Sequence, residues 1–173
     1  MENIVISCPI AQHLDLATLA SALTHATYKP EETPVLMVQV PQPRAAVFLF
    51  DSGEMKVTGV TSLSEAEEVV SLMDQRLSLL GVSKNKRAML TVEHAVASLH
   101  LGMPLPLDEL RKTLQVVPAE QPDFPGLMVK TEDPNTVILL FDSGKMVADG
   151  PSVEAVTDAL TELSSRLASG MKT

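Results

Sequence analysis

The chain has 173 residues, of which 45% are hydrophobic, and its formal net charge is −9 at pH 7. This length and composition allow a buried core, which excludes a disordered chain. The single cysteine, Cys8, excludes an internal disulfide and a multi-cysteine metal site. No apolar run approaches the roughly 20 residues that span a bilayer, so we expect a cytoplasmic protein without a membrane partner. The negative charge argues against nonspecific binding of polyanions, which normally requires Lys and Arg.

The first half of the chain predicts a strand, a helix, three strands and a longer helix. Residues 3–7 have the short apolar pattern of a strand, and Asp15 can cap a helix whose leucines recur at helical spacing. Ser64 and Glu67 form a capping box ahead of a long amphipathic helix, which we expect to end at Gly81. Alternating apolar residues between these helices predict an antiparallel meander at residues 37–40, 45–50 and 55–58.

The second half predicts the same elements again. A short basic linker, residues 83–87, leads into an apolar run at 93–99, which reads as a strand. Asp108 can cap the following helix, and Ser152 can cap a last amphipathic helix that Gly170 would stop. The sequence therefore predicts an α+β fold.

The two halves are copies of one another. Shifting the chain by 91 residues aligns residues 3–59 with 94–150 and gives 18 identities in 57 positions without a gap. The strongest match pairs 49–53 with 140–144, which both read Leu-Phe-Asp-Ser-Gly. Two copies are too few for a solenoid, so we expect a closed pseudo-two-fold domain. Its repeats would be residues 1–82 and 83–173.

Enzyme signatures are missing from the sequence. It contains no Gly-rich phosphate loop, no His-Glu-x-x-His motif and no Gly-x-Ser-x-Gly elbow. The four histidines have no metal-ligand spacing with a third partner. We therefore expect a protein that is not an enzyme and that uses no cofactor, metal or small-molecule substrate.

Several phrases of the sequence resemble archaeal TATA-binding proteins. Residues 133–150, which read Asp-Pro, Val-Ile-Leu-Leu-Phe, Ser-Gly-Lys-Met-Val and Gly in order, are similar to the second-repeat signature of that family. Residues 124–127, Phe-Pro-Gly-Leu, resemble its stirrup phrase, and residues 2–5 resemble the start of its first repeat. The resemblance covers essentially the whole chain. It implies a TBP-like saddle, in which two repeats form one curved antiparallel sheet with helices on the convex face.

The resemblance also implies a function, because TATA-binding proteins are the standard example of apolar wedges that open the minor groove and kink DNA. The family carries two phenylalanine wedges in each repeat. Phe50, Phe124 and Phe141 occupy three of these positions, and Thr33 occupies the fourth. The chain would be a general transcription factor that binds and bends AT-rich promoter DNA.

Binding residues follow from the same resemblance. Glu120 and Leu127 would contact a transcription factor B-like protein, the second partner after AT-rich double-stranded DNA. Glu54 and Asp149 would place negative charge near the DNA. The residues assigned to DNA contact are Asn3, Val5, Arg44, Phe50, Lys56, Thr58, His94, Val96, Phe124, Phe141, Lys145 and Val147.

A second reading of the sequence is a divergent paralogue with weak or no DNA binding. Four residues favour it, because they replace a wedge, a basic side chain or a groove-reading side chain of the family: Thr33, Glu54, His94 and Asp149. Such a protein would act as a protein-interaction module or as a regulator of basal transcription factors.

Overall fold

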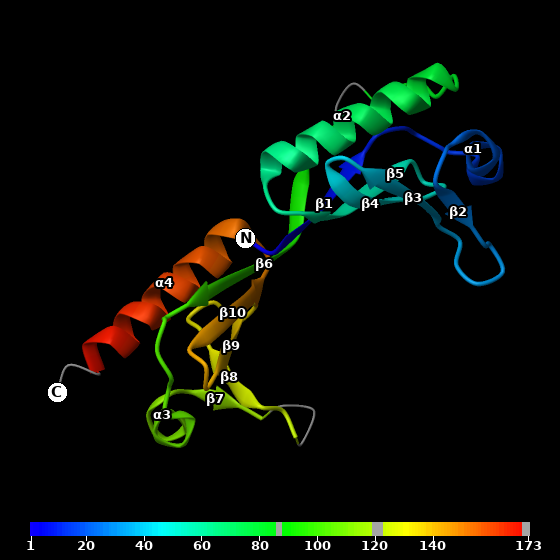
Figure 1. Ribbon diagram of the computed structural model, residues 1–173. Coiled ribbons are helices and arrows are strands. Elements are labelled where there is room, and N and C mark those ends of the chain that lie inside the picture. The colour runs from blue at the N-terminus through cyan, green and yellow to red at the C-terminus, as the bar shows by residue number, and fades with distance from the viewer. Residues whose placement is uncertain (86–87, 119–122, 171–173) are drawn as a thin grey trace. The chain divides into compact units, whose positions relative to one another are not determined.

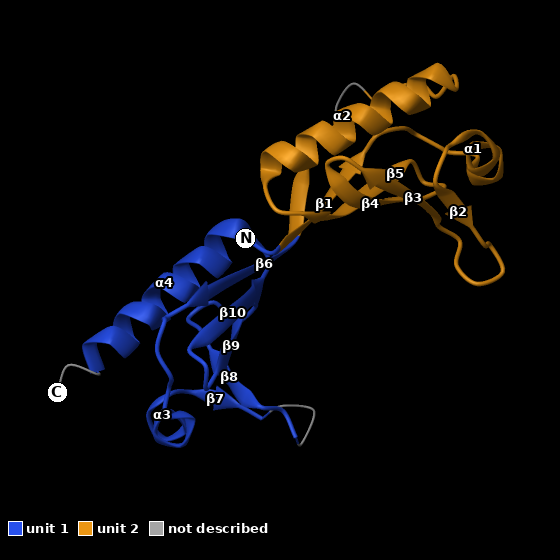
Figure 2. Cartoon of the chain, in the orientation of Figure 1, with its two compact units in different colours: residues 1–2, 94–173 blue, residues 3–93 orange. Residues whose placement is uncertain are grey.

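The computed structural model describes residues 1–85, 88–118 and 123–170. It divides into two compact units, which are coloured separately in Figure 2. Unit 2 comprises Asn3–Glu93, and unit 1 comprises Met1–Glu2 with His94–Thr173. Residues 86 and 87 of the predicted basic linker lie outside the described residues.

Both units have the same order of elements, namely a strand, a short helix, four strands and a long helix (Figure 1). The elements of unit 2 are β1 (Asn3–Pro9), α1 (Leu16–Ala22), β2 (Ala26–Tyr28), β3 (Leu36–Pro41), β4 (Arg44–Leu49), β5 (Glu54–Val60) and α2 (Leu63–Leu79). Those that follow are β6 (Thr91–His100), α3 (Leu107–Thr113), β7 (Val116–Val117), β8 (Gly126–Lys130), β9 (Val137–Phe141), β10 (Lys145–Gly150) and α4 (Val153–Gly170). The predicted duplication therefore appears as two copies of one topology.

The strands of each unit are antiparallel neighbours. Their order is β2-β3-β4-β5-β1 in unit 2 and β6-β10-β9-β8-β7 in unit 1. Register pairs such as Phe48 with Lys56 on β4 and β5, and Asp149 with Val96 on β10 and β6, fix which side chains share a face. The predicted α+β class is confirmed.

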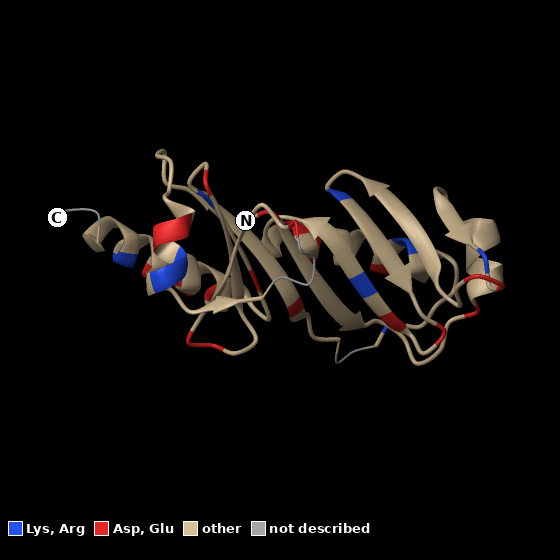
Figure 3. Ribbon diagram, turned by 90° about the horizontal axis from the view of Figure 1, so that it is seen from below, with Lys and Arg blue, Asp and Glu red and all other residues tan. Residues whose placement is uncertain are grey.

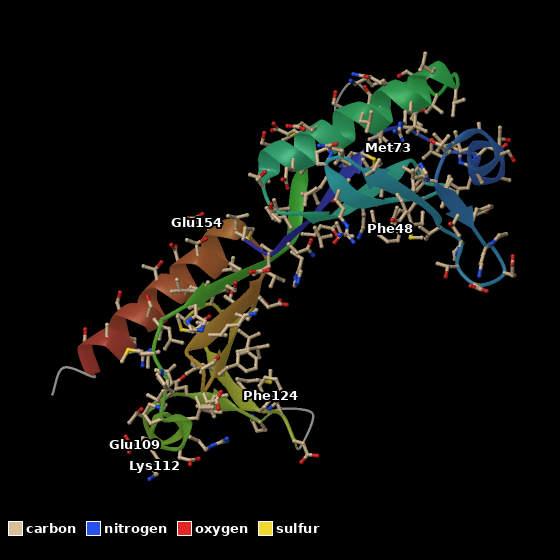
Figure 4. All side chains as sticks on the ribbon, in the orientation of Figure 1. Phe48, Met73, Glu109, Lys112, Phe124 and Glu154 are labelled. Carbon is tan, nitrogen blue, oxygen red and sulfur yellow. The ribbon has the colours of Figure 1, made fainter. Side chains whose placement is uncertain are left out.

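Alternation along the strands separates a buried face from a partly exposed one. In unit 2, the buried residues of β1 and β5 face α2, which contributes Val69, Met73 and Leu77 to the core. In Figure 4, Met73 lies between α2 and the strands, whereas Phe48 projects from their other side. Unit 1 has an equivalent core beneath α4, which includes Leu127, Val129, Ile138, Leu140, Met146, Val156, Leu160 and Leu163. We call the side of each sheet away from its helices the helix-free face.

Helix ends follow the sequence signals with two corrections. The carboxylate of Asp15 caps α1 as predicted, by accepting hydrogen bonds from the amide and hydroxyl of Thr18. The capping box of α2 is formed by Ser62 and Glu65, so the predicted pair two residues later was wrong. Asp108 lies inside the first turn of α3, whose N-cap is Pro106, so the predicted cap was wrong there too.

Gly81 ends α2 as predicted. Its φ of +83° follows the C-cap residue Leu80, and the amide of Val82 donates to the carbonyl of Leu77 at 3.0 Å. This is the Schellman arrangement, in which a residue without a Cβ adopts the left-handed conformation. Within the described part of the chain, no helix has both the length and the apolar character that a membrane crossing requires.

Candidate nucleic-acid interface

The helix-free face of unit 2 brings together most of the predicted first-repeat residues. Its strands are pleated, so residues two apart point to the same side. Half-buried or exposed side chains therefore alternate with fully buried neighbours such as Leu49, Met55 and Val57. The predicted residues that lie on this face are Asn3, Val5, Arg44, Phe50, Lys56 and Thr58.

An aromatic residue that the sequence analysis missed lies on the same face. Phe48 is half-buried on β4, and Phe50 follows it by two residues, directly after the strand ends, so both rings project to the same side. They line a hollow of about 270 Å³ together with Thr33, Val35 and Met37. The period-two spacing of the two phenylalanines was the signal that could have identified Phe48.

Asn3 has a defined orientation on this face. Its amide nitrogen donates to the Thr58 hydroxyl at 3.2 Å, and its carbonyl oxygen accepts from the backbone amide of Gly59 at 2.8 Å. Side-chain amides and hydroxyls can both donate to the acceptors on the floor of the minor groove. The Asn3 and Thr58 pair is therefore an uncharged group suited to that floor.

Unit 1 has an ionisable pair at the equivalent place. His94 and Asp149 stand 91 residues after Asn3 and Thr58, and His94 Nε2 lies 3.2 Å from Asp149 Oδ2. Their side chains are 41% and 45% exposed on the helix-free face. The carboxylate can only accept hydrogen bonds, like the A·T minor-groove floor, so it does not complement that surface. The predicted Val96, Lys145 and Val147 lie on the same face.

The two second-repeat phenylalanines contact one another. The ring centroids of Phe124 and Phe141 are 5.8 Å apart and their planes are inclined by 57°. Both rings are half-buried, and a Cβ on Gly126 would lie 3.0 Å from the ring of Phe124 and 2.7 Å from the Leu140 carbonyl oxygen. Gly126 thus leaves space for the ring. The equivalent positions in unit 2 are Val35 for Gly126 and Thr33 for Phe124.

One lysine on the helix-free face of unit 2 is paired with a carboxylate. Lys56 Nζ donates to Glu93 Oε2 at 2.8 Å. This hydrogen bond is the main reason that the pKa of Glu93 is lowered and that of Lys56 is raised, so both groups are ionised near neutral pH. Sequence reasoning missed Glu93, because its significance depends on a lysine 37 residues away.

Comparison with known proteins bears on the whole chain. The family model described as "Transcription factor TFIID (or TATA-binding protein, TBP)" matches residues 1–80 and 89–169. The chain belongs to the TATA-binding protein family. A TATA-box-binding protein of Pyrococcus horikoshii is 34% identical over 155 residues, covering 90% of this chain and 81% of its own length. One from Thermoplasma acidophilum is 33% identical and covers 90% and 85%.

The fold of the family is confirmed by a solved structure. Methanococcus jannaschii TBP matches this chain with a TM-score of 0.85 and 32% identity, over 95% of this chain and 94% of its own. Of the two residues predicted to contact a transcription factor B-like protein, Glu120 lies outside the described residues. The side chain of Leu127 is 1% exposed and packs in the core of unit 1, whereas the prediction placed it on a contact surface. Within the described residues, no cluster of three His, Cys, Asp or Glu could hold a metal ion.

Proposed function

We propose that this chain is a TATA-box-binding general transcription factor that binds and bends AT-rich double-stranded DNA through the minor groove. The observation that carries the proposal is the pair of half-buried rings, Phe124 and Phe141, on the helix-free face of a TBP-family fold. A protein that wedges base steps apart needs apolar rings that are accessible before DNA arrives. The archaeal relatives are themselves TATA-box-binding proteins.

The helix-free faces supply the other contacts in this proposal. The Asn3 and Thr58 pair would donate to minor-groove acceptors, and apolar side chains such as Val5, Val96 and Val147 would cover the groove floor. Arg44, Lys56 and Lys145 would contact phosphates, which fix the position of the protein without reading sequence. Phe50 would insert at the first-repeat end, with His94 beside the groove in the second repeat. In this proposal the protein lies in the cytoplasm with the chromosome and acts as a DNA-binding protein, not as an enzyme.

We further propose that the chain recruits a transcription factor B-like protein, as the family resemblance implies. Glu120 is the residue proposed for that contact, since the buried Leu127 offers no side-chain surface. Glu120→Arg should prevent formation of a ternary complex on DNA while leaving binary DNA binding within twofold. Loss of both complexes would instead assign Glu120 to folding or to DNA binding.

The paralogue with little DNA binding is retained as the second candidate, because specific charges favour it. Asp149 and Glu54 both lie on helix-free faces, and His94 is engaged with Asp149 at 3.2 Å. Carboxylates beside DNA phosphates oppose binding. Such a protein would act through protein contacts alone.

One experiment separates these candidates. DNA bending is measured by fluorescence transfer between the labelled ends of an AT-rich duplex, at about 150 mM salt because affinity depends on salt. The three proteins are wild type, Thr33→Phe and Thr33→Phe with Asp149→Thr. Bending by wild type eliminates the paralogue. If none of the three bends the duplex, the promoter-binding proposal is wrong.

A further inference from the structure

The helix-free face of unit 2 contains a lysine whose charge is already neutralised inside the protein. Lys56 lies in the middle of β5, opposite Ser7 on β1 and Phe48 on β4. Its ammonium is 2.8 Å from the carboxylate of Glu93, and the two side chains are 36% and 34% exposed. Ser7 also contributes to the lowered pKa of Glu93. Glu93 is therefore engaged with Lys56, next to a surface that would meet DNA.

The other unit contains the same carboxylate and serine without the lysine. Shifting by the repeat length of 91 residues relates Glu93 to Glu2 and Ser7 to Ser98. The hydroxyl of Ser98 donates to Glu2, as expected if the arrangement is duplicated. Val147, however, stands where Lys56 would be. A lysine therefore lies against this carboxylate in unit 2, and a valine occupies the equivalent position in unit 1.

We propose that Glu93 sets the affinity of this protein for DNA by holding Lys56 in an ion pair that a phosphate or groove acceptor must replace. This inference rests on the proposed function. A free lysine gains affinity by releasing condensed counterions from DNA when it neutralises a phosphate. A lysine already neutralised by a carboxylate contributes less affinity, because its ion pair must first be broken. The displaced carboxylate is then left beside the negatively charged DNA.

Removal of Glu93 should leave the fold intact. Partly exposed ion pairs contribute about 0–1 kcal/mol to stability, and glutamine preserves the shape and hydrogen-bonding capacity of the side chain. The effect of Glu93→Gln should therefore appear in DNA binding. Freed from its partner, Lys56 should neutralise one additional phosphate.

The experiment compares four proteins by salt-titrated binding to one AT-rich duplex. Glu93→Gln should bind about five- to tenfold more tightly than wild type near 100 mM salt, with a log–log salt slope steeper by about 0.9. Glu2→Gln removes the same charge at the equivalent place, where no lysine is present, and should change affinity less than about twofold with an unchanged slope. Adding Lys56→Gln to Glu93→Gln should abolish the gain. Thermal unfolding of all four proteins establishes that they are folded.

Each result decides between the alternatives. If Glu93→Gln and Glu2→Gln change the affinity equally, the gain comes from net charge alone and the proposal is overturned. An unchanged salt slope in Glu93→Gln would also overturn it. A gain that survives Lys56→Gln would also overturn it. If wild type binds no duplex, the proposed function fails. Binding acquired by Glu93→Gln would then still support the role of Glu93, and continued absence of binding would refute that role as well.

Discussion

Truncation of the two second-repeat rings tests the candidate interface most directly. Phe141 is half-buried on the helix-free face and contacts Phe124 at a centroid distance of 5.8 Å, whereas its chain neighbour Leu140 is 0% exposed in the core. An aromatic pair contributes about 0.5–1.5 kcal/mol beyond its buried area. Replacing both rings with Ala should therefore lower the free energy of unfolding by about 1–3 kcal/mol. Leu140→Ala, which empties a core position, should cost about 2–5 kcal/mol.

The consequence for DNA should be far larger than that for stability. Unstacking a base step costs a few kcal/mol and is brought about by inserted apolar side chains, so the double variant should not bend DNA. Unfolding is followed by circular dichroism, and bending by fluorescence transfer on an end-labelled AT-rich duplex. If the double variant loses as much stability as Leu140→Ala, the rings belong to the core and the wedge assignment is refuted. Undiminished bending by a folded double variant would refute it equally.

Four further substitutions test other parts of the interface and of the repeat. Asp149→Thr removes a carboxylate from the helix-free face and should tighten DNA binding by about 1–3 kcal/mol in a gel-shift titration. Unchanged affinity would mean that position 149 does not meet DNA. Thr33→Phe should tighten binding modestly, because the adjoining hollow of about 270 Å³ exceeds the roughly 150 Å³ that holds benzene in an engineered cavity. Adding Val35→Gly should increase that gain, because the equivalent Gly126 makes space for a ring in unit 1. If neither variant gains affinity, positions 33 and 124 are not equivalent in DNA binding. Gly144→Ala should lower the free energy of unfolding by roughly 2–4 kcal/mol, since φ is +85° and a Cβ would meet the Met103 carbonyl oxygen; a variant as stable as wild type would contradict this turn.

Much of the fold could be predicted because its determinants are local or duplicated. The 91-residue repeat predicts that each half has the same elements, and the cap at Asp15 and the stop at Gly81 depend only on neighbouring residues. The short strands β2 and β7 were not predicted, since three and two residues are too few to show alternation. Ser62 is the N-cap of α2 and Ser64 is the second residue of that helix, so only the position of the helix start distinguishes the two serines.

Residues of the candidate site could be assigned from the sequence where the assignment depends on a single side chain. Phe50 and Phe141 were assigned as wedges from the family resemblance, and both are half-buried on the helix-free faces, while their contact with DNA stays a prediction. The ion pairs between side chains of the site could not be predicted in this way. The partners of Lys56 and Asp149 are 37 and 55 residues distant in sequence, so their charges looked independent until the strands aligned them. Phe48 was missed because a single phenylalanine on a strand is usually a core residue.

The net charge of −9 is distributed unevenly, and this bears on how the protein would bind DNA. The helices carry a net charge of −5, mainly on α2 and α4, whereas the strands carry +1. In Figure 3, where Lys and Arg are blue and Asp and Glu are red, most of the strand ribbon is tan. The strands contain four cations, Arg44, Lys56, Lys130 and Lys145, and Glu93 neutralises one of them. Three phosphate contacts would give a log–log salt slope of about −2.7, so binding should depend on apolar contact more than on charge. A measured slope of about −6 or steeper would mean that cations outside the strands dominate, and that the helix-free faces are not the principal DNA-binding surface.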